Sequence, residues 1–94
     1  MINLTAEFFA IDGCEKSLKD SLIKMIEPSR NESGCVSYCL YKNVKNTRVF
    51  TFHEQFKDQS SFELHCNSAH FKNMIKEVSS LIVDEPKITF LEEV

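Results

Sequence analysis

The spacing of hydrophobic residues changes along this chain in an order that few folds can accommodate. A period of two, which is typical of strands, marks residues 2–11, 35–42, 48–56 and 87–92. A period of three to four, which is typical of helices, marks residues 18–29 and 62–82. The resulting order of strand, helix, strand, strand, helix and strand is the ferredoxin-like βαββαβ arrangement. We therefore predict an α+β fold in which both helices cover one face of a four-stranded antiparallel sheet.

Residues at the ends of these segments predict where the helices begin and end. Asp12 and Glu15 have the spacing of a capping box, so Asp12 is expected to cap the first helix. Pro28 lacks a backbone N–H and should kink or end that helix. Asp58 is suited to cap the second helical segment, and Ser68 to cap a second piece of it.

Length and charge limit the classes of function. A length of 94 residues allows one small domain and no separate cofactor domain, so we expect a single domain over residues 1–94. Eleven basic against 14 acidic residues give a net charge of −3, whereas a nucleic-acid partner requires a basic face. RNA-recognition domains share the element order, but residues 48–56 lack the basic and glycine start of their signature. We expect no nucleic-acid partner.

The cysteines and the N-terminal residues indicate the cellular compartment of the protein. Cys35 and Cys39 would lie about 13 Å apart along a strand, too far for a disulfide. Their spacing is also not that of zinc or redox sites, so we expect reduced thiols. The first residues lack the basic region and cleavage site of a signal peptide, and no apolar run approaches the length of a membrane span. We expect a cytoplasmic protein with no membrane partner.

The sheet face turned away from the helices is expected to be too apolar to remain in water. Phe9, Ile11, Thr51 and Thr89 fall on this face when the strand alternation is followed. A large apolar face on a small domain usually marks an interface, and identical chains most often pair with two-fold symmetry. We therefore predict a homodimer that forms through the sheet faces.

The residue with the least ordinary setting is Glu54, which shares a strand face with Phe50, Phe52 and Phe56. A carboxylate among aromatic side chains must be paired, protonated or functional. It could anchor a neighbouring backbone amide or histidine, or it could orient a histidine that acts as a base. His65 lies on the hydrophobic face of its helix and should point at the sheet, as a structural group or as that base.

Three further polar residues have two interpretations each. His70 could pack the junction between two helical pieces or contact a ligand, and Tyr38 could pack its ring or present its hydroxyl to a ligand. His53 is expected on the face away from the helices. His65 and His70 are five residues apart and should not share a helix face, so we predict no metal site.

Two stretches of the sequence resemble the antibiotic biosynthesis monooxygenase family. EPSRNESGCVSYCLYKN (27–43) is similar to its EPSR-x-E-x-G-C-x-x-Y-x-L-Y stretch. FTFHEQFKDQSSFELHCNSAHFKNM (50–74) is similar to its second signature, in which a strand ending in Glu and an aromatic residue leads to F-x-x-H-x-x-S-x-H-F. The resemblance covers almost the whole chain and implies a ferredoxin-like dimer that forms an α/β barrel, with a cavity between sheet and helices in each subunit.

The resemblance implies a cofactor-free monooxygenase that oxidises a small quinol or phenol with O₂. Carried over to this chain, its typical positions are Tyr38, Glu54, His65 and His70. His65 would be the base, Glu54 its orienting group and Tyr38 a hydrogen-bond donor to the substrate oxygen. The substrate-binding residues would be Phe50, Phe52, Phe62, Phe71 and His70. The chain has no Trp, which argues against the haem-degrading branch; the positions of its Trp and His are His65 and Ile75 here.

Two other functions are compatible with the same scaffold. One is an enzyme that isomerises or cleaves a small metabolite, and a phosphorylated substrate would need a cation such as Arg30. The other is a dimer that binds a ligand without converting it. Turnover of a quinol, and its sensitivity to substitution of His65, would distinguish them.

Overall fold

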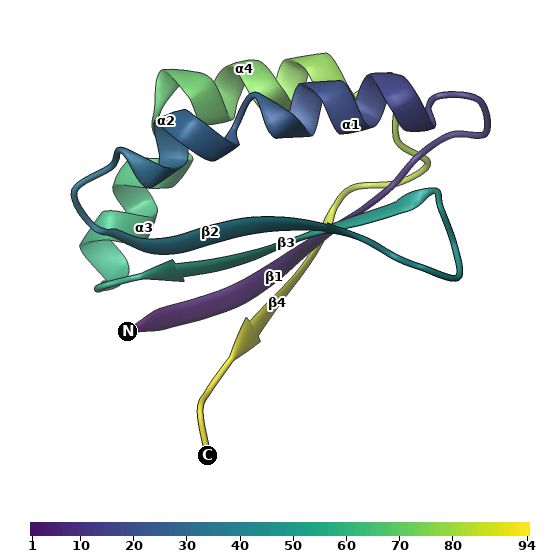
Figure 1. Ribbon diagram of the computed structural model, residues 1–94. Helices are drawn as coiled ribbons and strands as arrows, with labels where there is room; N and C mark the ends of the chain where they lie inside the picture. Colours follow the sequence, from purple (N-terminus) through teal and green to yellow (C-terminus); the bar gives the residue numbers. More distant parts are fainter.

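The computed structural model describes residues 1–94 and shows eight elements in the predicted order. The strands are β1 (Ile2–Phe9), β2 (Cys35–Lys42), β3 (Val49–Phe56) and β4 (Lys87–Leu91). The helices are α1 (Glu15–Ile23), α2 (Ile26–Arg30), α3 (Gln59–Cys66) and α4 (Ala69–Val78). The sheet has the order β2-β3-β1-β4, every pair is antiparallel, and all helices lie on one face (Figure 1). The ferredoxin-like α+β prediction is confirmed.

Each of the two predicted helical segments is divided into two helices. The first breaks at Lys24 and Met25, ahead of Pro28, which lies in the first turns of α2, where a missing N–H costs little. The second breaks at Asn67, and Ser68 caps α4 by accepting a hydrogen bond from the backbone N–H of Phe71. The two pieces of the second segment therefore point in different directions.

The predicted caps have mixed outcomes. Asp58 caps α3 by accepting a hydrogen bond from the Ser61 backbone N–H at 2.8 Å. The capping box at Asp12 is wrong, because Gly13 adopts a φ of 90° and the helix starts only at Glu15. The Glu15 carboxylate accepts a hydrogen bond from the Gly13 N–H instead, at 2.6 Å.

Alternation along the two central strands separates the core from the open face. Leu4, Ala6 and Phe8 on β1 are buried beneath the helices, and every second residue of β3 is buried with them: Phe50, Phe52, Glu54 and Phe56. Glu54 lies directly between Leu4 on β1 and Tyr38 on β2 in the sheet register. The strands therefore place one carboxyl group at the centre of the hydrophobic layer.

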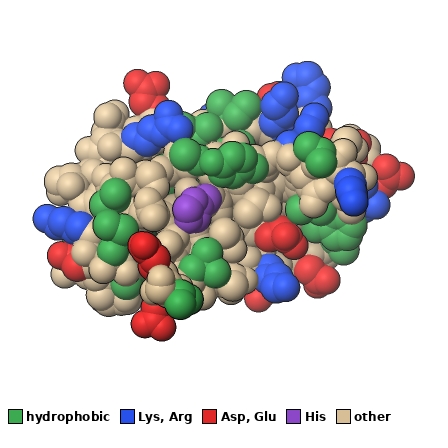
Figure 2. Space-filling view, turned by 60° about the horizontal axis from the view of Figure 1, so that its bottom comes forward, with side chains coloured by type: hydrophobic (Ala, Val, Ile, Leu, Met, Phe, Trp, Pro, Cys, Tyr) green, Lys and Arg blue, Asp and Glu red, His purple; other side chains and the backbone are tan.

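The other face of the sheet is not covered by any element of this chain. Thr51 and His53 of β3 are half-buried there, and His53 Nε2 lies 2.7 Å from the Asn3 side-chain oxygen. Figure 2 shows a histidine and several hydrophobic side chains near the middle of the molecule in this view, with most charged side chains toward its rim. In the alternation of β3, His53 lies opposite the buried Phe52 and Glu54, so it faces away from the helices, as predicted.

β4 is the most exposed strand of the sheet. It pairs only with β1, and all five of its residues are exposed. It runs below the rest of the sheet to the C-terminal residues in Figure 1. None of the helices is long and apolar enough to span a lipid bilayer.

Candidate active site

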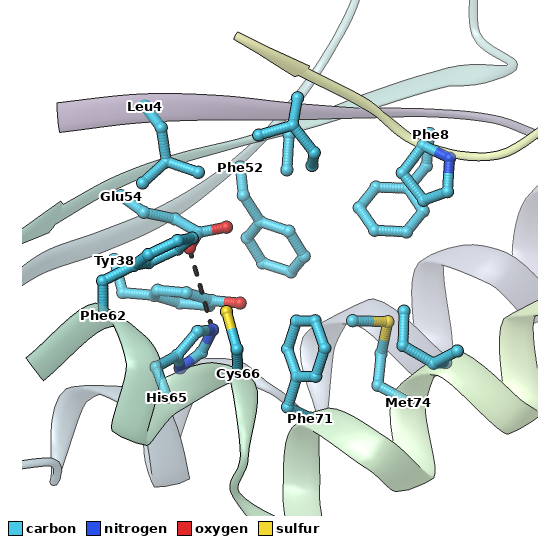
Figure 3. A pocket seen from close by; sticks show the side chains of 14 residues that line it. Leu4, Phe8, Tyr38, Phe52, Glu54, Phe62, His65, Cys66, Phe71 and Met74 are labelled. Carbon is cyan, nitrogen blue, oxygen red and sulfur yellow. Dashed lines mark ion pairs between the residues drawn. The ribbon is translucent and has the colours of Figure 1, made fainter. Parts of the chain in front are cut away.

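A cavity of about 120 Å³ lies between the sheet and helices α3 and α4 (Figure 3). Eleven of its 14 lining residues are hydrophobic. A dry apolar cavity of roughly 150 Å³ accepts a benzene ring, so this one has the size for a single small ring. The lining residues are Leu4, Ala6, Phe8, Tyr38, Phe52, Glu54, Phe62, His65, Cys66, Phe71, Met74, Ile75, Pro86 and Ile88.

Glu54 reaches this cavity from the sheet. Its side chain is almost fully buried, and no hydrogen-bond partner in the chain replaces the lost water at close range. Burial, followed by the negative charge of Glu32, raises the pKa of the Glu54 carboxyl to about 8. Near neutral pH, Glu54 therefore carries a proton and can donate it.

His65 faces Glu54 from the last turn of α3, as Figure 3 shows. Its Nε2 lies 3.7 Å from Glu54 Oε1, and its ring is 1% exposed. The ring packs against Tyr38 and Phe56, with centroid distances of 5.4 and 4.9 Å. Burial lowers the pKa of His65, although Glu32 has the opposite effect. The lowered pKa keeps the ring neutral and able to accept a proton.

The carboxylate that holds His65 is Glu32, a residue that the sequence patterns do not single out. Its Oε2 and Oε1 lie 2.9 and 3.2 Å from His65 Nδ1. A carboxylate only accepts hydrogen bonds, so Nδ1 carries the hydrogen and Nε2 of the neutral ring keeps a lone pair toward the cavity. The sequence suggested that Glu54 orients the histidine. In the structure, the carboxylate hydrogen-bonded to His65 Nδ1 is that of Glu32.

Glu32 is held in place by the turn between α2 and β2. Its backbone N–H donates to the Ser29 carbonyl and its carbonyl accepts from the Cys35 N–H, both at 3.1 Å. No hydrophobic period marks a residue in such a turn. Its only signal in the sequence is its place within the EPSR-x-E-x-G-C stretch.

His65 and His70 lie on different helices and do not share a helix face, yet both reach the same carboxylate oxygen of Glu32. The break at Asn67 and Ser68 changes the direction of the chain, and His70 at the start of α4 turns back toward Glu32. His70 Nε2 lies 2.5 Å from Glu32 Oε2, and the two imidazole centroids are 6.0 Å apart.

The donor atoms of Glu32, His65 and His70 all lie within 4.8 Å of one another, close enough to surround one metal ion. Each ring already donates a hydrogen bond to the same carboxylate, so the three groups satisfy one another without an ion. We interpret them as a hydrogen-bonded network rather than a metal centre.

Tyr38 lies beside Glu54 with its ring buried and its side chain lining the cavity. Burial and the neighbouring Glu54 raise the pKa of the Tyr38 hydroxyl above its ordinary value, so it stays protonated. Its backbone carbonyl accepts a hydrogen bond from Arg30 Nε at 3.0 Å. Arg30 is thus committed to the backbone, and no Lys or Arg lines the cavity.

The aromatic residues predicted to form the pocket fall into two groups. Phe52, Phe62 and Phe71 line the cavity. Phe50 is buried in the core opposite Phe8 and does not line it. His70 lies outside the cavity, in a groove between α1 and α4.

The cavity wall also contains residues that no sequence pattern marked as functional. Cys66 follows His65 on α3, and burial raises the pKa of its thiol. Pro86 directly precedes β4 and Ile88 lies within it. The sequence pattern there indicates only a short strand. Ile75 adds an apolar side chain to the wall.

Comparison with known proteins gives one family. The family model described as antibiotic biosynthesis monooxygenase matches residues 1–77. A candidate monooxygenase of Mycobacterium tuberculosis, Rv0793, is 28% identical over 90 residues, which are 96% of this chain and 88% of that protein. An uncharacterized Synechocystis protein, sll1783, is 29% identical over 63 residues, and the match spans only 43% of its length.

Solved structures show the same fold over nearly the whole chain. PA3566 from Pseudomonas aeruginosa superposes with a TM-score of 0.94 at 29% identity, covering 99% of this chain and 93% of that one. The Rv0793 structure superposes with a TM-score of 0.93 at 26% identity, covering 99% and 94%.

Proposed function

Because this chain belongs to the antibiotic biosynthesis monooxygenase family, we propose that it is a cofactor-independent monooxygenase that oxidises a small hydroquinone or phenol with O₂. The observation that carries the proposal is the meeting of His65 Nε2 and the Glu54 carboxyl in an apolar, ring-sized cavity. One group can accept a proton and the other can donate one, so the site suits a reaction that needs both.

The proposed reaction begins with removal of a proton. His65 Nε2 takes the hydroxyl proton of the hydroquinone, and the electron-rich anion transfers an electron to O₂. Recombination of the two radicals forms a carbon–oxygen bond and a ring peroxide. The O–O bond then breaks and the ring carbon loses its hydrogen, so hydroquinone and O₂ become a hydroxyquinone and water.

The other side chains have separate parts in this sequence. Glu54 gives its proton to the departing oxygen, which leaves as water, and Tyr38 donates a hydrogen bond to the substrate oxygen. Phe52, Phe62 and Phe71 exclude water and hold the ring. An apolar wall without Lys or Arg does not favour a phosphorylated substrate.

We also propose that two copies of the chain pair through their open sheet faces. Support comes from the uncovered face that carries Thr51 and His53, and from exposed hydrophobic side chains such as Phe9, which is 37% exposed. The cavity lies on the opposite side of the sheet, so pairing would leave the helical layer free.

Oxygen uptake by chelator-treated protein with a panel of single-ring hydroquinones tests the function. The wild-type protein should consume O₂, and His65→Gln should reduce the rate at least about 100-fold because the general base is lost. His53→Gln is the matched control where light scattering shows that it keeps the wild-type mass, because His53 lies on the other face of the sheet from the cavity. Uptake that is equal in wild type and His65→Gln would refute the assignment, and binding of a hydroquinone without uptake would favour a non-catalytic ligand-binding protein.

A further inference from the structure

A continuous series of ionisable groups leads from the cavity to a separate groove. Glu54 lies 3.7 Å from His65 Nε2, His65 Nδ1 lies 2.9 Å from Glu32 Oε2, and the same oxygen lies 2.5 Å from His70 Nε2. The last two contacts are hydrogen bonds, and both are made to Oε2 of the Glu32 carboxylate. His65 therefore has one nitrogen toward the cavity and the other toward a path that leaves it.

Exposure increases along this path. The side chain of His65 is 1% exposed, that of Glu32 is 18% and that of His70 is 26%. His70 lines an open groove between α1 and α4, together with Lys24, Asn73 and other polar residues. The path thus begins in an apolar cavity and ends at solvent.

At the first step, before Glu54 has given up its proton, the ionisable groups beside His65 offer its proton no other acceptor. Burial raises the pKa of the Tyr38 hydroxyl and of the Cys35 and Cys66 thiols, with further contributions from Glu54 or Glu32. These groups keep their own protons near neutral pH and cannot accept another. At the far end, Lys24 is paired with Glu77 at 3.1 Å and does not contact His70.

We propose that His65, Glu32 and His70 form a proton relay that connects the cavity with solvent through the groove between α1 and α4. The use of this relay in turnover rests on the proposed monooxygenase function. The relay itself is a property of the folded protein and needs no substrate.

The proton balance of the relay is closed. His65 Nε2 accepts one proton from the cavity, and its Nδ1 proton passes to Glu32. His70 exchanges ring protons with water, and in the tautomer whose Nε2 is bare it takes the proton from Glu32. His70 then releases its Nδ1 proton to water, so one proton enters at the cavity and one leaves at the surface.

The cavity gives a reason for such a path. A single ring fills a space of about 120 Å³, so bound substrate displaces water from His65 Nε2. The proton taken from the substrate then cannot return to solvent through the cavity. Exit through Nδ1 leaves His65 with its hydrogen on Nε2. Once Glu54 has given its proton to the departing oxygen, that Nε2 hydrogen passes to the Glu54 carboxylate while a proton from solvent returns through His70 and Glu32 to Nδ1. Both residues then regain their starting states, and the full reaction releases no net proton.

Imidazole NMR of ¹⁵N-labelled protein tests the relay without any substrate. The measured quantity is the rate at which the buried His65 Nδ1 proton exchanges with water. His70→Gln keeps an amide donor within reach of Glu32 but cannot pass protons, so exchange should slow at least about tenfold and then depend on local opening. Asn73→Ala alters the same groove without touching Glu32 and should leave the rate at the wild-type value.

This measurement distinguishes a His70 that passes protons from a His70 that only shields the site. Unchanged or faster exchange in His70→Gln would overturn the relay, because faster exchange means that His70 only shields the site. A second readout uses imidazole buffer, which should restore rapid exchange in His70→Gln in proportion to its concentration. Failure of imidazole to do so would equally count against a proton path.

Turnover adds a readout that depends on the proposed function. In His70→Gln, kcat for the fastest hydroquinone should fall at low buffer and recover with added imidazole, while KM stays near the wild-type value. If no hydroquinone is consumed by the wild-type protein, the proposed function fails and the NMR exchange rates still decide the relay.

Discussion

The burial of Glu54 links the stability of this protein to pH. Its pKa of about 8 in the folded state lies well above the value of roughly 4.3 in an unfolded chain. Between these values the folded protein holds a proton that the unfolded chain has lost. The stabilising effect is complete below pH 4.3 and is lost as pH rises through about 8.

We expect the free energy of unfolding to fall by about 1 kcal/mol per pH unit between pH 7 and 8. Glu54→Gln should remove most of this slope and be more stable than the wild type at pH 9. Urea unfolding at several pH values measures it. This range avoids His65, whose lowered pKa affects stability mainly below about pH 6.5.

Glu63→Gln is the matched control for this prediction. Glu63 is an exposed glutamate on the same helix as His65. Its replacement should leave the wild-type slope. If Glu54→Gln kept that slope too, ionisation of Glu54 would not be the cause.

At the residue scale, strand and helix periods predicted the neighbours Glu54 and His65 but not Glu32. The period of two places Glu54 on the buried face of its strand, and the helical period places His65 on the buried face of its helix. Both side chains therefore point into the layer between sheet and helices. Glu32 lies in a turn, where direction depends on the path of the whole chain. The same limit explains His70, because a break of one or two residues changes which way the next helix faces.

Gly34, directly before β2, packs closely against α3, one of the elements that hold the site. A Cβ atom on Gly34 would lie 2.0 Å from Ser61 Oγ and 2.3 Å from Ser61 Cβ, both far inside van der Waals contact. Gly34 also accepts a hydrogen bond from the Lys57 N–H at 2.9 Å, which ties the start of β2 to the end of β3. A small residue at position 34 thus sets how closely α3 approaches the sheet.

Gly34→Ala should lower the free energy of unfolding by about 1–3 kcal/mol, as overpacking does elsewhere. Thermal unfolding measures this loss. Adding Ser61→Gly should recover part of it, because that substitution removes both clashing atoms. Ser60→Gly in the same background is the control; recovery of the same size there would show that the contact with Ser61 is not responsible.

At the element scale, the order and faces of the strands were predictable, while the helix ends were less so. Strand alternation is strong in residues 2–9 and 49–56, and the caps at Asp58 and Ser68 behave as their residue types predict. The start of α1 was misplaced because Gly13 at positive φ adds a turn before it. A single backbone angle of this kind leaves no hydrophobic pattern.

The open sheet face is a property of the whole molecule. We expect light scattering to give about twice the chain mass of 10.9 kDa for the wild type. Thr51→Arg would place a charge near the centre of the proposed contact and should give the monomer mass. A monomeric wild type at micromolar concentration would contradict pairing through this face.

Leu64→Arg is the control for this prediction. Leu64 is 71% exposed on α3, on the helical side of the molecule. The same charge placed there should leave the mass unchanged. Loss of the dimer in Leu64→Arg would instead place the contact on the helical layer.

The position of β4 has a consequence for how the protein is made. β4 pairs with β1 between residues as far apart as Asn3 and Leu91, and its segment supplies Pro86 and Ile88 to the cavity wall. Contacts of such long range form late, because the loop between them must close first. During synthesis β1 therefore waits with one edge unpaired until the ribosome has added residues 87–91. The nascent chain therefore has its helices, with His65 and His70, before it has the β4 part of the cavity wall, so a ligand that needs the complete wall cannot assist the earlier steps of folding.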